Sequence, residues 1–165
     1  MKYIVAIILS IFIIASCGIY SFTGASIPSN AKTVSVSYFK TTTTNAPSSL
    51  KETMTEGLKN LLLSQTDLNL QETEADLNFI GEIIKYKITP MAIKANETAA
   101  KNRLTIEIKM QYKNNFQDKD NFESTFSRYR DFNNSENLVD VENVLIEEIT
   151  TELLEDVFNK AFVNW

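Results

Sequence analysis

Apolar and polar positions alternate without a break across residues 103–113, and this is the clearest pattern in the chain. The apolar positions of the run are Leu104, Ile106, Ile108, Met110 and Tyr112. Because successive side chains of a strand point to opposite faces of a sheet, one face of this strand is expected in the core. The other face is expected to meet solvent or a partner.

Three further segments have the composition of strands. Residues 33–40 place Val34, Val36 and Tyr38 between Ser and Thr, residues 77–89 are rich in Ile, and residues 122–132 are rich in aromatic side chains. Pro90 is expected to end the second of these, because proline cannot donate to a strand ladder. Gly81 is expected to mark a bulge, since the apolar parity changes near it. A polar turn over residues 114–121 separates the last two strands.

Two segments have helical periodicity. Residues 48–64 carry Leu50, Met54, Leu58, Leu61 and Leu62 at helical spacing. Asp140 is expected to cap a long final helix with a wide apolar stripe. The order strand, helix, three strands, helix predicts an α+β fold: a two-layer sandwich with a four-stranded mixed sheet and two amphipathic helices on one face. The first strand is expected to pair in parallel with a later strand.

The N-terminal region predicts a lipoprotein. Lys2 precedes an apolar run that ends in Ile14, Ala15, Ser16 and Cys17, the single cysteine of the chain. Residues 1–16 are therefore interpreted as a lipoprotein signal peptide, and Cys17 as the lipidation site that holds the mature protein to a membrane by its N-terminal acyl chains. Residues 17–31 form a tether rich in Ser and Gly. Residues 32–165 form one domain.

The composition disfavours several classes of function. The chain has no histidine, so the commonest general base and metal ligand are missing, and we predict no enzyme, no catalytic residue, no metal and no cofactor. The carboxylates Glu147, Glu148, Glu152, Glu155 and Asp156 are interpreted as a solvated helix face. Without residues 1–16, 15 basic side chains stand against 21 acidic ones, which disfavours nucleic acid as a partner.

Charge is unevenly distributed along the chain. Residues 85–113 contain seven basic and two acidic side chains, whereas residues 136–165 contain eight acidic side chains and one basic. Strand pairing would gather the basic side chains on the sheet face away from the helices, where they could meet an anionic partner. The alternative is a solvated face whose lysines discourage edge pairing.

Several segments resemble the LptE family of lipopolysaccharide-assembly lipoproteins. They are CGIYSFTG (residues 17–24), DLNFIG (76–81), NRLTI (102–106), FSRY (126–129) and the terminal Asn164 and Trp165. The resemblance implies an outer-membrane lipoprotein that sits inside the LptD β-barrel, assists its assembly and helps to deliver lipopolysaccharide to the outer leaflet. It also implies two helices on a four-stranded mixed sheet, with the body in the periplasm or the barrel lumen.

The basic residues that contact lipopolysaccharide in the family do not align with this chain. Candidates therefore come from placement: Lys94, Lys101 and Arg103 lie near the turn between two strands and suit charge-assisted hydrogen bonds to lipid A phosphates. Two other functions stay open. One is a structural adaptor lipoprotein of another envelope complex. The other is a carrier of a small apolar ligand, which would need a cavity between helices and sheet.

Overall fold

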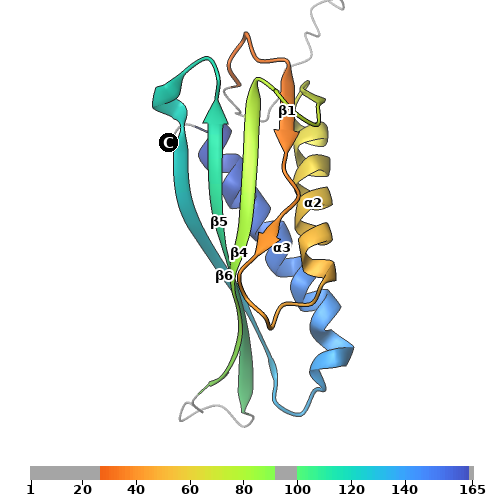
Figure 1. The fold of residues 1–165 in the computed structure, drawn as a ribbon. Helices are drawn as coiled ribbons and strands as arrows, with labels where there is room; N and C mark the ends of the chain where they lie inside the picture. The colour runs from red at the N-terminus through yellow and green to blue at the C-terminus, as the bar shows by residue number, and fades with distance from the viewer. Residues whose placement is uncertain (1–26, 92–99, 164–165) are drawn as a thin grey trace, which may run out of the picture.

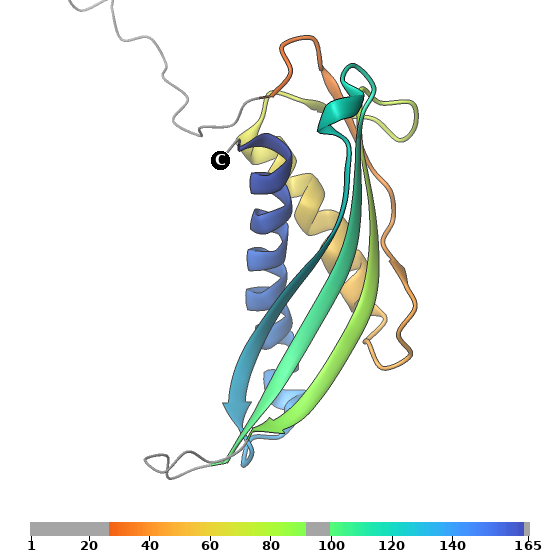
Figure 2. The ribbon, with the colours of Figure 1, turned by 90° about the vertical axis from the view of Figure 1, so that its left-hand side faces the viewer.

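The computed structural model describes residues 27–91 and 100–163, which form two layers (Figures 1 and 2). One layer is a twisted sheet, and the other is a pair of helices that covers one of its faces. The elements are β1 (Thr33–Val36), β2 (Lys40–Thr41), α2 (Ser49–Gln65), β3 (Asn69–Leu70), β4 (Leu77–Met91), β5 (Lys101–Asn114), η1 (Asp118–Asp120), β6 (Phe122–Asn133) and α3 (Leu138–Phe162). The predicted α+β sandwich is confirmed.

The sheet is mixed, as predicted, but it has six strands and not four. Its order is β3-β1-β4-β5-β6, and β2 pairs separately with β4. The strands β4, β5 and β6 form an antiparallel meander, whereas β1 runs parallel to both β3 and β4. The extra strands arise because the first predicted strand divides into β1 and β2, and because the two-residue β3 adds an edge.

Phe39 divides the first strand. The prediction placed Tyr38 in the core, but Tyr38 is exposed and Phe39 is 1% exposed. The backbone N–H of Phe39 donates to the Thr55 hydroxyl of α2 at 3.0 Å and not to a neighbouring strand. The chain therefore leaves the ladder after Val36, turns Phe39 inward and rejoins β4 at Lys40.

Gly81 makes room for the Phe39 ring and does not form a bulge. A Cβ atom at this position would lie 2.3 Å from the Phe39 ring, so only glycine lets that ring rest on β4. The bulge lies between Ile83 and Lys85, where the register with β5 shifts. The prediction of a bulge at Gly81 was therefore displaced by a few residues.

Pro90 does not end β4, contrary to the prediction. It pairs with Asn102, and the strand continues to Met91. Near Pro90, β4 pairs only with β5 among the described residues. Proline has no backbone N–H, and at a position where that N–H would point away from β5 its absence removes no ladder hydrogen bond.

The helices pack an apolar face on the sheet. In α2 the buried apolar residues are Leu50, Met54, Leu58 and Leu62, and the helix agrees with its predicted bounds to within a residue. The long α3 begins at Leu138, and its N-cap is Asn137, whose side chain accepts from the Val139 N–H. Asp140 lies in the first turn and is not the cap. The core between the layers is filled by side chains such as Phe79, Tyr112 and Phe162, which contact one another.

Ion pairs join the outer edge of the sheet to the last helix. Arg128 of β6 donates twice to Asp156, at 2.6 Å each. Arg130 binds Glu148 at 2.7 Å and also Glu152. These acids were interpreted as a solvated helix face. Glu148, Glu152 and Asp156 remain partly exposed to solvent, but they also lie one helical turn apart opposite the two arginines and pair with them.

A second polar anchor holds the start of the domain. The Asp76 carboxylate accepts from the backbone N–H groups of Lys32 and Thr33 and from the Thr33 hydroxyl, at 2.8 to 2.9 Å. These hydrogen bonds to its charged form lower the pKa of Asp76, the Lys32 N–H contributing most. Asp76 thereby ties the loop before β4 to the first residues of β1.

The strand register can be tested by introducing a charge on either face of β5. Ile106 is 0% exposed, so Ile106→Asp buries an unpaired carboxylate and is expected to cost several kcal/mol, enough to unfold the domain. Thr105→Asp places the same charge on the polar face, opposite Lys87, and is expected to leave the melting temperature almost unchanged. Equal effects of the two variants in thermal denaturation would contradict the register.

The Asp76 anchor should make stability depend on pH. A carboxylate whose pKa is lowered by folding stabilises the protein above its unfolded pKa and loses this effect as the pH falls, since the unfolded state then binds more protons. The melting temperature of the wild type should therefore fall as the pH is lowered through about 4. Asp76→Asn should melt lower at neutral pH and show a weaker pH dependence. Asp67→Asn, at an exposed position, is the matched control and should behave as the wild type does.

Candidate functional site

The sheet face opposite the helices carries most of the charged side chains of the strands. Because the residues of β5 alternate, its odd-numbered positions share this outer face with their partners in β4 and β6. The basic residues on it are Lys85, Lys87, Lys101, Arg103, Lys109 and Lys113, and the acidic ones are Glu82, Glu107, Glu123 and Asp131. The expected gathering of basic side chains is therefore present, but carboxylates are interspersed among them.

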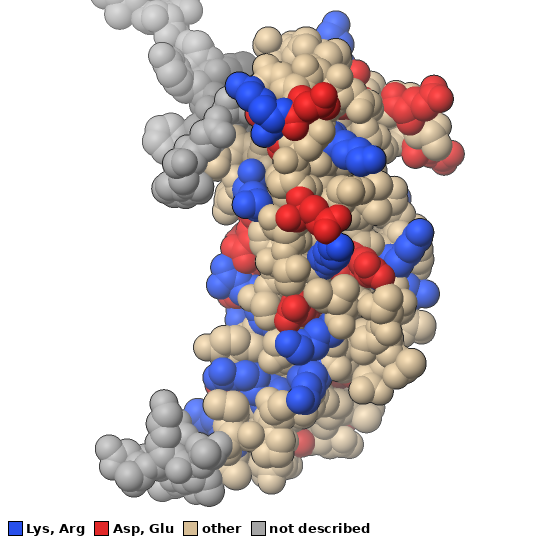
Figure 3. All heavy atoms as spheres, turned by 60° about the vertical axis from the view of Figure 1, so that its left-hand side comes forward, with Lys and Arg blue, Asp and Glu red and all other residues tan. Residues whose placement is uncertain are grey.

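The excess of positive charge lies toward the β4–β5 hairpin. The rungs nearest the hairpin carry Lys101, Arg103, Lys87 and Lys85 against only Asp131 and Glu107. Farther from it, Lys109 and Lys113 are balanced by Glu82 and Glu123. Figure 3 shows Lys and Arg side chains concentrated toward this end of the molecule. An anionic ligand is thus favoured at the hairpin end of the face.

Arg103 is held by two neighbours on β6. Its guanidinium donates to both oxygens of Asp131, at 2.7 and 2.9 Å, and lies 3.6 Å from the centre of the Tyr129 ring. The hydrogen bonds from Arg103 are the largest cause of the lowered pKa of Asp131, and the charge of Lys101 lowers it further. The guanidinium is therefore fixed in position and already partly neutralised.

Two lysines of the face are also paired. Lys85 donates to Glu107 at 2.9 Å, and Lys109 lies 2.6 Å from a Glu123 oxygen. The interaction with Glu123 raises the pKa of Lys109. Such exposed pairs contribute little to stability and exchange partners readily, so an incoming phosphate can compete for these cations.

The structure describes two of the three candidate residues. Lys94 lies outside the described residues. Lys101 and Arg103 stand two residues apart on the outer face of β5, next to the hairpin, as expected. Lys87 and Tyr129 were not singled out as candidates. Their positions could have been derived from strand parity, which places both of them on the rung of Thr105.

The arrangement presents cationic groups that can bind anions. Between residues 27 and 91 and between 100 and 163, no group of three or more acidic, cysteine or histidine side chains could hold a metal ion. No helix in these ranges is long and apolar enough to span a membrane. What the face provides is guanidinium and ammonium groups beside the exposed ring of Tyr129.

Comparison with protein families gives a match over most of the chain. The LptE lipopolysaccharide-assembly family matches residues 31–161. No curated protein matches the chain.

Solved structures share the fold at low sequence identity. A minor lipoprotein from Acinetobacter baumannii is 12% identical with a TM-score of 0.52, covering 79% of this chain and 91% of that one. A hypothetical protein from Chlamydia trachomatis is 10% identical with a TM-score of 0.56, covering 81% and 99%. A protein from Xanthomonas campestris is 7% identical with a TM-score of 0.50, covering 81% and 87%. These similarities concern the fold alone.

Proposed function

Since this chain belongs to the LptE lipopolysaccharide-assembly family, we propose that it is an outer-membrane lipoprotein subunit of the lipopolysaccharide translocon. In this role it sits inside the LptD β-barrel, assists the assembly of that barrel and helps to insert lipopolysaccharide into the outer leaflet. The single observation that carries the proposal is the family match over residues 31–161.

The two-faced sheet supports a position inside a barrel. The helices α2 and α3 cover one face. The other face presents charged and hydroxyl side chains along the long strands β4, β5 and β6. The lumen of an outer-membrane barrel is polar, because lumen-facing residues alternate with lipid-facing ones. A compact domain with a broad polar face is suited to such a wall.

The hairpin end of the outer face supports direct contact with lipopolysaccharide. We assign the phosphate contacts to Lys94, Lys101 and Arg103, with Lys87 added from the structure. The Arg103 fork is oriented by Asp131, so a phosphate would share or replace that carboxylate as its partner. The ordering of this side chain before binding lowers the entropy that binding must overcome.

Charge reversal at the hairpin end should weaken lipopolysaccharide binding. The variant in which Lys94, Lys101 and Arg103 are all replaced by Glu lacks three cations. Each lost contact contributes about 1.5 to 3 kcal/mol to the binding free energy if it is partly desolvated. Purified protein should therefore bind lipopolysaccharide much more weakly in low salt. Circular dichroism should show an unchanged fold.

The matched control reverses three cations elsewhere. Replacing Lys113, Lys119 and Lys160 by Glu changes the net charge by the same amount. These three residues lie near the opposite end of the sheet. This variant should keep most of the affinity. Equal losses in the two variants would indicate a general charge effect and no local site, and unchanged binding in the first would remove the basic patch from the proposal.

The partner can be tested by purification in mild detergent. The protein should copurify with a large outer-membrane β-barrel at one-to-one stoichiometry, and its depletion should lower both the assembled barrel and surface lipopolysaccharide. Recovery of a different envelope complex would favour the adaptor alternative. Normal barrel levels after depletion would exclude an assembly role.

The lipid anchor depends on Cys17, which lies outside the described residues. Cys17→Ser should prevent acylation and leave an uncleaved precursor, because no other thiol is present in the chain. Mass spectrometry of the membrane form would check this. A wild-type N-terminus without acyl mass, or one that begins before Cys17, would contradict the lipoprotein assignment.

A further inference from the structure

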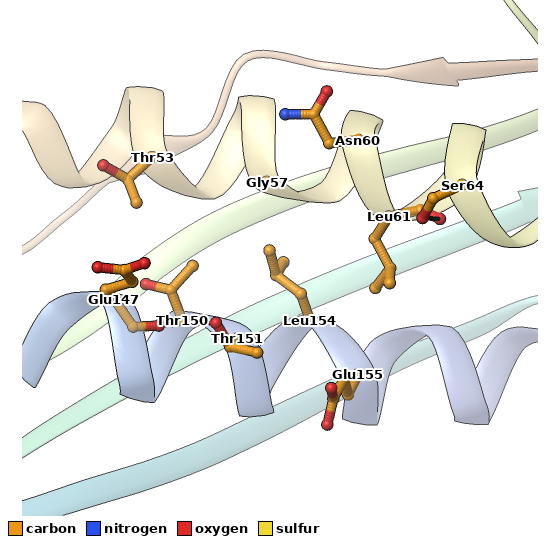
Figure 4. Close-up of a pocket in the computed structure, with 10 residues that line it drawn as sticks. All are labelled: Thr53, Gly57, Asn60, Leu61, Ser64, Glu147, Thr150, Thr151, Leu154 and Glu155. Atoms are coloured by element: carbon orange, nitrogen blue, oxygen red, sulfur yellow. Dashed lines mark hydrogen bonds between the residues drawn. The ribbon is translucent and has the colours of Figure 1, made fainter.

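A groove runs between α2 and α3 on the side of the helical layer that faces away from the sheet. Its volume is about 420 Å³, and Figure 4 shows the ten residues that line it, five from each helix. Its floor is formed by Gly57, Leu61, Thr150 and Leu154. The helices belong to the same body as the basic face, but the groove lies on the other layer and shares no residue with it.

Gly57 lies at the floor of the groove, where it faces Leu154 of α3. A Cβ atom here would lie 2.7 Å from a terminal methyl carbon of Leu154, so the glycine leaves room for Leu154 against α2. Glycine within a helix costs about 1 kcal/mol relative to alanine. The small residue lets Leu154 pack closely against α2 and form an apolar floor where the two helices approach.

The rim of the groove is acidic. Glu147 and Glu155 line it from α3, and no Lys or Arg is among the lining residues. Unlike Glu148, Glu152 and Asp156 on the same helix, these two form no ion pair or side-chain hydrogen bond among the described residues. They stand eight residues apart, about 12 Å along the helix.

Thr150 is the one buried side chain in the described ranges whose polar atom has no hydrogen-bond partner. The residue is 4% exposed and lines the groove, with its methyl group toward Gly57. A buried hydroxyl without a partner destabilises the fold, whereas valine would fill the same space with no polar atom. Threonine adopts two rotamers in helices, so its hydroxyl can turn toward the groove.

We propose that this groove docks a segment of a partner protein that carries an apolar anchor between basic residues. The anchor fills the hollow over Gly57 and Leu154. The flanking Lys or Arg side chains pair with Glu147 and Glu155, and a polar atom of the segment satisfies Thr150. This surface is additional to the basic face proposed for lipopolysaccharide.

The charge of the rim selects this occupant over two others. A phosphorylated lipid would be repelled by both carboxylates. A second copy of the chain, docked groove to groove about a two-fold axis, would bring Glu147 and Glu155 against their own equivalents. A basic segment alone gains from both the apolar floor and the acidic rim.

The test is photo-crosslinking of the full lipoprotein in intact cells. A photoreactive amino acid is placed at Asn60 or Thr151 in the groove, and at Thr125 on the outer sheet face as a control. The two groove positions should capture one protein, and mass spectrometry should map the linked segment to an apolar residue flanked by Lys or Arg. Position 125 should not capture that segment.

Charge reversal then tests the rim. Glu147→Lys with Glu155→Lys should lower the crosslinking yield at the groove by about tenfold or more. Glu72→Lys with Glu74→Lys changes the net charge equally at an exposed loop and should leave the yield unchanged. A product with lipid or with a second copy, a linked segment without basic flanks, an unaltered yield after reversal, or no crosslink would each overturn the proposal.

Thr150→Val separates binding from folding. In the purified full chain it should raise the melting temperature, because it removes a hydroxyl without a partner, and in cells it should lower the crosslinking yield severalfold. A destabilised protein could not produce this combination. An unchanged yield would overturn the assignment of Thr150 as a contact.

Discussion

The burial of one face of the β4–β5–β6 meander is the constraint on which the rest of the structure depends. Alternate residues of a strand point to opposite faces of the sheet, so every second residue of β5 lies under the helices. The residues between them then form a continuous polar face on the other side. The core and the candidate lipopolysaccharide site are therefore formed by the two opposite faces of the same strands. A shift of register by one position would destroy both together.

The acidic composition has a local cause. Much of the negative charge of α3 opposes Arg128 and Arg130, which point inward from the edge strand toward the helix. Inward-pointing charges also make an edge strand a poor template for further pairing. Part of the acidic excess of residues 136–165 thus reflects a contact between β6 and α3. Glu147 and Glu155, on the groove side of the same helix, form no such pair with β6 among the described residues.

The outer face carries cations that are held in different ways. Arg103 is held between Asp131 and Tyr129, whereas Lys85 and Lys109 are each held by one exposed ion pair. A face of this kind can bind a large anionic ligand without a closed pocket. The packed core gives no support to a carrier of apolar molecules, because side chains from both layers fill the space where its cavity would be.

The sequence by itself determined the helices, the three long strands, the parity of β5 and the family, because these follow from local periodicity and from short motifs. Only the tertiary structure decided where Phe39 leaves the ladder, why Gly81 is glycine and how Pro90 is tolerated, since each depends on a residue distant in the chain or on a missing neighbour strand. The same holds for Asp131 beside Arg103 and for the groove between α2 and α3. Periodicity reveals which side of an element is buried, but the contact between two elements depends on packing that no single segment encodes.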